Sequence, residues 1–222
     1  IYDATTGKLR ESIDYKTDEY KSDQPLWVGA SENGKLVGLI GNGQLYVTDL
    51  STKQNIFSLK SQWGTNGYIT TAAFIDNDKL LVINEDFITL YALATKAKIW
   101  QYVHKLTWGT ASFIKVSQDK SRIYASSAYQ KNILVLNTKT GAVAQHMKSS
   151  FSKVNLVMQP QYNNNIISLV GDGRALQLNL RSGMLENKNI FKLDEAYWKT
   201  RIVCKENDIY CNSSYLNIYR KN

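Results

Sequence analysis

The stretch FIKVSQDKSRIYASSAYQKNILVLNTKTGAVAQHMK, residues 113–148, decides the fold. It reads as four short strands, FIKVS, RIYASSA, ILVLN and AVAQHMK, separated by the polar turns QDKS, YQKN and TKTG. Apolar, β-branched runs of this length, bounded by Asp, Asn, Gly and Lys, are typical of a small antiparallel sheet. One such sheet cannot bury both of its faces, so we expect the unit to recur and to stack against copies of itself.

The end of the third strand does recur along the chain. Five copies are LYVTDLSTK (45–53), TLYALATK (89–96), LVLNTKTG (134–141), LQLNLRSG (176–183) and LNIYRKN (216–222), and IYDATTG (1–7) is a sixth. With Asp3, Asp49, Ala92, Asn137 and Asn179 taken as equivalent, successive copies are 46, 43, 45 and 42 residues apart. A period near 40–45 residues with four strands in each unit predicts the blades of a β-propeller.

The turn between the first and second strands keeps the same period. Its copies are SENGK (31–35), IDNDK (75–79), SQDKS (117–121), QYNNN (161–165) and KEND (205–208). Asn, Asp, Ser and Gly suit such turns because their side chains cap the backbone or accept positive φ. A β-sandwich would not need similar turns in the same order, so a repeat fold is the better interpretation.

We therefore predict an all-β protein, a single β-propeller domain over residues 1–222 with about five four-stranded blades. Four complete units end near residue 192, and the last segment offers only three strands, TRIVCK, DIYCNS and YLNIYRK. The N-terminal strand KLRESIDY (8–15) would close this last blade and remove a free edge. The alternative is an arc of a larger ring. Because the chain opens in mid-repeat, we expect a mature or trimmed product.

The units resemble WD-repeat and quinoprotein-like propeller repeats over essentially the whole chain. SENGKLVGLIGNGQLYVTDLSTKQ (31–54) is similar to a WD-repeat core, with Thr48-Asp49 in place of the Trp-Asp pair and no Gly-His pair. ALATKAKIWQY (92–102) resembles the tryptophan turn of quinoprotein-like repeats, with Ala92 and Lys96 where Asp and Gly are usual. The resemblance implies a propeller fold and no particular activity.

Composition sets broader limits. The 222 residues are 43% hydrophobic and 21% charged, as in ordinary globular proteins, and apolar runs are strand-length, so we predict no transmembrane helix. The formal charge is +8. It is uneven: residues 1–111 carry 11 basic and 12 acidic side chains, and residues 112–222 carry 16 and 7. A basic sector could attract an acidic protein, anionic lipid or nucleic acid. The basic residues are dispersed singly, however, which is typical of a solvated surface.

Four tryptophans each lie just before a predicted first strand, namely Trp27, Trp63, Trp108 and Trp198. Loops at equivalent positions of a ring emerge on one face, so these side chains could form an aromatic rim that binds a partner, since Trp and Tyr dominate binding hot spots. The alternative is that each Trp packs between neighbouring blades as part of the core. Both interpretations hold if the body of each indole ring is buried and the edge of that ring is exposed.

The two cysteines, Cys204 and Cys211, flank the KEND turn. A hairpin that paired Lys205 with Tyr210 would place them opposite each other, close enough for a disulfide. The glycosylation acceptor Asn212-Ser213-Ser214 follows at once. Together these features favour an oxidising compartment. Two reduced cysteines in a cytosolic protein, with an unused acceptor, remain the alternative.

The sequence contains few candidates for catalytic residues. His104 and His146, the only histidines, lie in outer-strand regions, where we expect them to be partly exposed. Neither has a Ser, Cys or carboxylate at a spacing typical of a triad or a metal pair. Two cysteines without a nearby histidine leave a zinc shell incomplete. We therefore predict no catalytic residues, no metal, no cofactor and no small-molecule substrate.

The sequence thus favours a non-enzymatic propeller that serves as a protein-protein interaction platform. Quinoprotein-like propellers occur in assembly factors on the trans side of membranes, so the resemblance implies a subunit of a larger assembly in the periplasm, the ER lumen or outside the cell. Membrane contact would then be indirect. The alternative is a cytosolic WD-repeat adaptor whose basic face contacts RNA, the ribosome or acidic partners, and a propeller enzyme is a third hypothesis.

Overall fold

In the computed structural model, the protein is built from β-strands. The structure describes residues 5–9, 12, 27–41, 43–60, 68–104, 111–127, 132–148, 156–158, 166–171, 174–179, 182, 185–192, 201–205, 208–212 and 216–220. Beyond Met147, this description concerns the backbone, apart from Asn179 and Ser182. In these parts of the chain there is no helix long and apolar enough to cross a membrane.

The strands form five antiparallel sheets, each a meander in sequence order. Blade 1 comprises β1 (Trp27–Ala30), β2 (Leu36–Gly41), β3 (Gln44–Asp49) and β4 (Gln54–Lys60). Blade 2 comprises β5 (Ile69–Phe74), β6 (Lys79–Asn84), β7 (Phe87–Ala92) and β8 (Lys98–Val103). Blade 3 comprises β9 (Ala111–Val116), β10 (Arg122–Ser127), β11 (Asn132–Asn137) and β12 (Val143–Lys148). Blade 4 comprises β13 (Leu156–Met158), β14 (Ile166–Gly171), β15 (Arg174–Asn179) and β16 (Leu185–Lys192), and blade 5 comprises β17 (Arg201–Lys205), β18 (Asp208–Asn212) and β19 (Leu216–Arg220).

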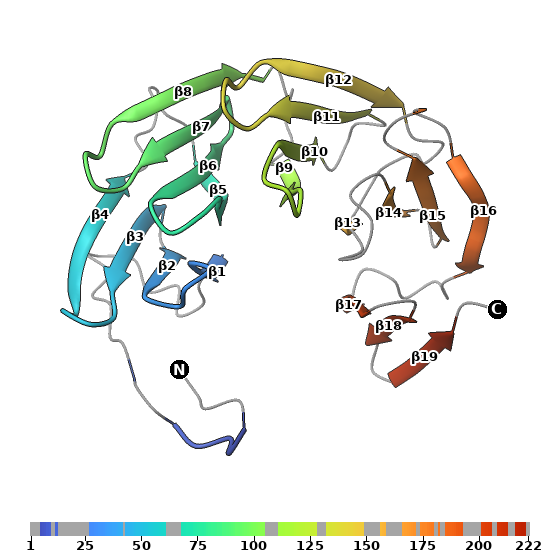
Figure 1. Ribbon diagram of the computed structural model, residues 1–222, viewed down its shortest axis with the longest axis horizontal. Coiled ribbons are helices and arrows are strands. Elements are labelled where there is room, and N and C mark those ends of the chain that lie inside the picture. The colour runs from blue at the N-terminus through green and yellow to red at the C-terminus, as the bar shows by residue number, and fades with distance from the viewer. Residues whose placement is uncertain are drawn as a thin grey trace.

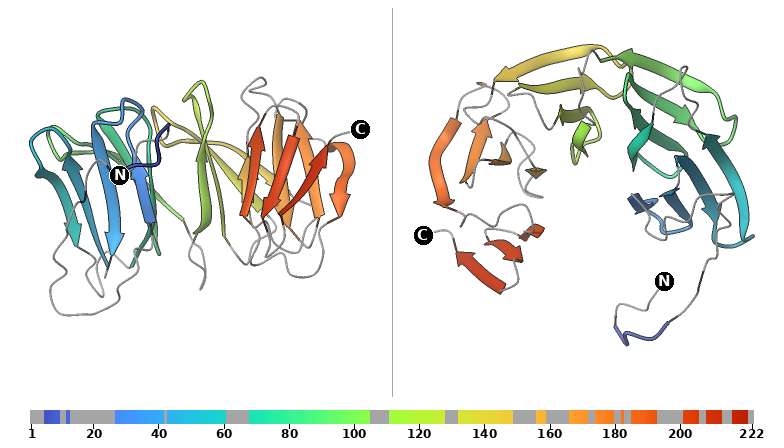
Figure 2. Two further views of the ribbon diagram at one scale, coloured as in Figure 1. Left: turned by 90° about the horizontal axis from the view of Figure 1, so that it is seen from below. Right: turned by 180° about the vertical axis from the view of Figure 1, so that it is seen from behind.

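The five sheets follow one another around an arc, as the blades of a propeller do (Figure 1). The first strand of each sheet lies on the inner side of the arc, and the last strand lies on the outer side (Figure 1). Successive inner strands β1, β5, β9 and β13 contact one another. Viewed from the side, the sheets stand side by side with their strands upright (Figure 2). The prediction of an all-β propeller is confirmed, and the described part of the molecule forms an arc.

The predicted repeat matches the observed strand ends. Asp49, Ala92, Asn137 and Asn179 are each the last residue of a third strand. The predicted closure by an N-terminal strand falls on residues 8–15, most of which lie outside the described part of the chain. Within that part, blade 5 has three strands.

The core lies between the blades rather than inside any one of them. One cluster joins blades 1 and 2 and includes Leu80 and Val82, while a second joins blades 2 and 3 and includes Leu81 and Ile83. These four neighbours on β6 are at most 2% exposed. Because successive strand residues point to opposite faces, each face of blade 2 is buried against a different neighbour. This explains why β6 is a continuous apolar run and not an alternating one.

Side-chain caps set the turns after the third strands. Asp49 Oδ1 accepts hydrogen bonds from the backbone N–H groups of Ser51 (2.8 Å) and Thr52 (3.2 Å). Asn137 Oδ1 accepts equivalent bonds from Lys139 (2.9 Å) and Thr140 (3.1 Å). These are the short Asp and Asn turns that the sequence predicts. The hydrogen bonds from Ser51 also lower the pKa of Asp49.

Candidate binding site at the channel mouth

The turns between the first and second strands of blades 1 and 3 share one construction. In blade 1, Ser31 Oγ lies 2.8 Å from Asn33 Oδ1 and accepts the N–H of Leu36 at 3.0 Å. In blade 3, Ser117 Oγ lies 2.6 Å from Asp119 Oδ1 and accepts the N–H of Arg122 at 2.9 Å. The hydrogen bond from Ser117 lowers the pKa of Asp119.

Each of these turns also has one residue in the left-handed region. Gly34 has φ +68° and the equivalent Lys120 has φ +58°. Glycine adopts this conformation freely, whereas a lysine there is uncommon. The matching geometry places equivalent side chains of blades 1 and 3 on the same face of the arc.

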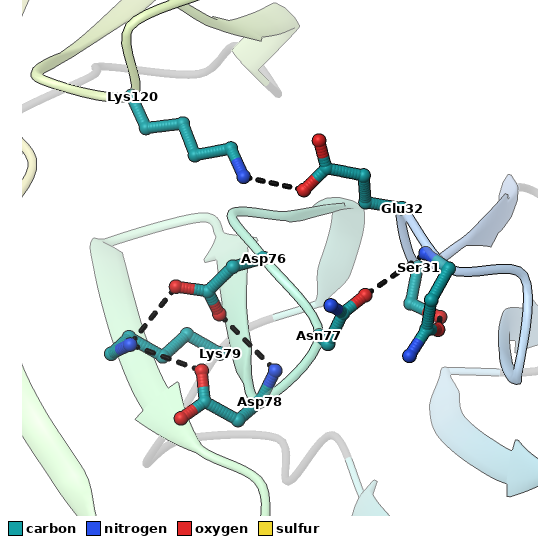
Figure 3. A network of polar contacts seen from close by, with 8 residues as sticks. Ser31, Glu32, Asp76, Asn77, Asp78, Lys79 and Lys120 are labelled. Atoms are coloured by element: carbon teal, nitrogen blue, oxygen red, sulfur yellow. Dashed lines mark hydrogen bonds and ion pairs between the residues drawn. The ribbon is translucent and has the colours of Figure 1, made fainter.

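Direct contacts join the turns of blades 1, 2 and 3. The backbone N–H of Asn33 donates to Asn77 Oδ1 at 2.9 Å, which ties blade 1 to blade 2. Lys120 Nζ lies 2.5 Å from Glu32 Oε2, so blade 3 reaches across blade 2 to blade 1 (Figure 3). We call this set of three turns the mouth.

Blade 2 contributes an internally paired acidic turn to the mouth. Asp76 Oδ1 accepts the N–H of Asp78 at 3.1 Å, and its Oδ2 lies 2.9 Å from Lys79 Nζ (Figure 3). Partial burial raises the pKa of Asp76, but the hydrogen bonds with Asp78 and Lys79 outweigh it and lower this pKa to about 2. Asp76 is therefore ionised and already held by its own turn.

Below the mouth lies a cavity of about 490 Å³. Its walls come from the inner strands of three successive blades, with Trp27 from blade 1, Phe74 from blade 2 and Ile114 from blade 3. Glu32, Asp76 and Lys120 line its polar edge. Binding pockets usually combine apolar walls with a few well-placed polar or charged groups, and this volume lies in their usual range.

Trp27 lines this cavity from the start of β1, and not from the loop before it. It is the first residue of β1 and is half-buried, with its ring centroid 6.3 Å from that of Phe74 in blade 2. A Cβ at Gly29 or Gly38 would approach the Trp27 ring to 2.3 or 2.7 Å, so these two glycines make room for it. This position agrees with packing between blades. Trp63, Trp108 and Trp198 lie outside the described residues, so the rim stays a prediction.

The expectation that His104 is partly exposed is wrong. His104 is only 5% exposed, and its Nε2 lies 2.9 Å from the carbonyl oxygen of Asn84. It directly follows Val103, the last residue of β8. His146, in β12, is exposed.

The hairpin register predicted for the cysteines is also wrong. Lys205 pairs with Asp208 and not with Tyr210, so Cys204 lies opposite Ile209, and Cys211 opposite Ile202. The connection has two residues instead of four, which shifts the pairing by two positions. The two cysteines are thus diagonal neighbours in the backbone ladder, a wider spacing than that of a directly opposed pair. The disulfide and glycosylation of Asn212 stay predictions.

Within the described residues, no group of three or more His, Cys, Asp or Glu side chains is arranged to hold a metal ion. Neither the tryptophans nor the cysteines of the sequence pointed to the mouth residues Glu32, Asn77 and Lys120. The signal was present, because the turn copies at 31–35, 75–79 and 117–121 must emerge on one face of a ring.

Comparison with known proteins supports the fold. No family model matches the sequence, and no curated protein matches it. Among solved structures, the chain is similar to a β-propeller chain from the crystal structure of the mitotic checkpoint complex, with a TM-score of 0.69 and 11% sequence identity. The match covers 95% of this chain and 64% of that chain. At this identity, the likeness shows the propeller fold alone.

Proposed function

We propose that the protein is a non-enzymatic propeller that binds a partner protein at the mouth. The observation that carries this proposal is the cavity at the joined turns of blades 1, 2 and 3, which has both apolar walls and charged groups. Three of its charged groups, Glu32, Asp76 and Lys120, are paired with other side chains, which suits recognition better than proton transfer. The turns of the site connect the first and second strands of three blades and are joined to one another by the Asn33–Asn77 and Glu32–Lys120 contacts.

The compartment and the assembly are a further part of the proposal. A periplasmic, luminal or secreted setting rests on the resemblance to quinoprotein-like repeats and on the acceptor at Asn212. The structural neighbour belongs to a protein complex, which supports a partner protein in general terms.

A displayed random-peptide library, selected on the purified protein, tests the binding site. Ala30 is an exposed residue of β1 that lines the cavity, so Ala30→Phe narrows the mouth without disturbing the core. Ser58 is exposed on the outer strand β4, which makes Ser58→Phe the matched control. We expect peptides selected on the wild type to bind Ala30→Phe about tenfold more weakly, a loss of about 1.4 kcal/mol.

Peptides that bind the Ser58→Phe control as they bind the wild type would localise the contact to the mouth. If the selected peptides bind Ala30→Phe and the wild type equally, the mouth is not the binding site and the proposal is wrong.

A further inference from the structure

The ion pair between Glu32 and Lys120 spans the mouth from blade 1 to blade 3. The two residues are 88 positions apart in sequence and belong to blades 1 and 3. Their side chains are 66% and 40% exposed. An exposed ion pair contributes little to stability, because water screens it and two long side chains must be ordered. The contact can therefore open at little cost.

Glu32 differs from the other carboxylates of the mouth. Both oxygens of Asp76 are engaged by Asp78 and Lys79 within the same turn. Asp119 is held by Ser117 and Ser121 in the same way. In the part of the chain that the structure describes, the partner of the Glu32 carboxylate comes from another blade (Figure 3). Glu32 can thus leave without breaking its own turn.

The charge at the mouth favours an acidic replacement. Once Glu32 has left, Lys120 can pair with a carboxylate from outside. Lys115 also lines the cavity and forms no ion pair among the described residues, so a second cation is available there. The apolar wall formed by Trp27, Phe74 and Ile114 lies next to these cations.

We propose that Glu32 pairs with Lys120 in the free protein and that an acidic side chain of a partner takes the place of Glu32 in the complex. The partner is an extended peptide segment in which a large apolar residue adjoins Glu or Asp. Its carboxylate displaces Glu32 from Lys120, and its apolar side chain enters the cavity. This inference rests on the proposed function, because it names the partner of the same site. Glu32 and Lys120 then have opposite effects on affinity, which a purely structural ion pair would not produce.

The probes are labelled, N-acetylated pentapeptides with Leu, Phe or Trp between two Glu residues. Their binding is measured by fluorescence anisotropy. Matched peptides with Gln in place of Glu serve as neutral controls. We expect Glu32→Gln to bind the acidic peptides about fivefold more tightly than the wild type does, the scale set by one exposed ion pair. Lys120→Asn, which suits the left-handed backbone, should weaken binding about fivefold. The double variant, Glu32→Gln with Lys120→Asn, should not bind the acidic peptides more tightly than the wild type does.

Each result decides the inference. Equal affinity of Glu32→Gln and wild type, with binding still lost in Ala30→Phe, overturns the masking role and leaves the proposed function intact. Failure of the acidic peptides to bind Glu32→Gln at millimolar concentration overturns the inference as a whole. A Glu32→Gln gain for single-stranded oligouridylate instead of the peptides identifies phosphate as the occupant and also overturns it. Thermal unfolding of each variant verifies that it is folded.

Discussion

His104 illustrates how a single residue depends on where its strand ends. Its ring is buried, and its Nε2 lies 2.9 Å from the carbonyl oxygen of Asn84, so Nε2 carries the proton and donates. Its Nδ1 has no hydrogen-bond partner among the described residues. Burial lowers the pKa of His104 from its ordinary value of 6.5, although the hydrogen bond to Asn84 opposes this.

This lowered pKa makes stability depend on pH. The unfolded chain binds a proton at His104 more readily than the folded chain does, so the stability is complete above pH 6.5 and falls as the pH drops below this value. We expect the urea midpoint to fall between pH 8 and pH 5.5, and to fall less in His104→Gln, whose amide can still donate to Asn84. The exposed His146→Gln is the control. Identical pH profiles for wild type and His104→Gln would contradict the assignment.

At the scale of the element, turns were predictable from the sequence and bulges were not. The short polar turns at Asp49 and Asn137 follow from side-chain chemistry, which acts over two or three residues. The fourth strands of blades 1 and 2 also carry a β-bulge opposite the same point of the third strand, between Val47 and Thr48 in blade 1 and between Leu90 and Tyr91 in blade 2. The register shifts at the equivalent points of blades 3 and 4 as well.

The extra residues of these bulges are Ile56, Ile99, Ala144 and Glu186. They share no chemical property, and none is a glycine, so the sequence carried no local signal. A bulge bends and twists the strand that contains it. We attribute it to the curvature that outer strands need when twisted sheets pack around an arc, and this is a property of the assembled blades.

The turn at Ala92 provides a prediction at the same scale. Its backbone matches that of Asn137, because Ala92 N–H donates to the carbonyl of Ala97 at 2.9 Å just as Asn137 N–H donates to Ala142 at 2.8 Å. Alanine has no side chain to cap the turn. Ala92→Asn should therefore stabilise the protein by about 0.5–1 kcal/mol, the usual value of one net hydrogen bond. The urea midpoint should rise with an unchanged slope.

Asparagine at Ala94, an exposed position two residues after Ala92, tests whether the cap is responsible for the stabilisation. Ala94→Asn places the same side chain in the same turn, two residues too late to cap it, and should leave the midpoint unchanged. If Ala92→Asn lowers the midpoint, the half-buried position rejects the larger side chain and the prediction is wrong.

For the whole molecule, the repeat predicted the architecture but not the contacts that join the turns of the mouth. The period in sequence predicted which strands belong to one blade, since each blade forms from local contacts. The mouth instead depends on residues 44 and 88 positions apart, Asn33 with Asn77 and Glu32 with Lys120. Their pairing requires the curvature of the arc, which no local pattern encodes. Attention to tryptophans favoured residues that pack well between blades, as Trp27 does.

Asn212 reports on the compartment of the protein better than the two cysteines do. Asn212 ends β18, so a glycan there needs no change of register, whereas a bridge between Cys204 and Cys211 requires the hairpin to slip by two residues. For protein purified from its native cells, we expect an intact mass that falls on enzymatic removal of N-glycans, and no such fall in Ser214→Ala, which destroys the acceptor. An unmodified Asn212 with two free thiols would contradict the luminal or secreted setting. Binding to RNA that weakens steeply with salt would then favour the cytosolic adaptor.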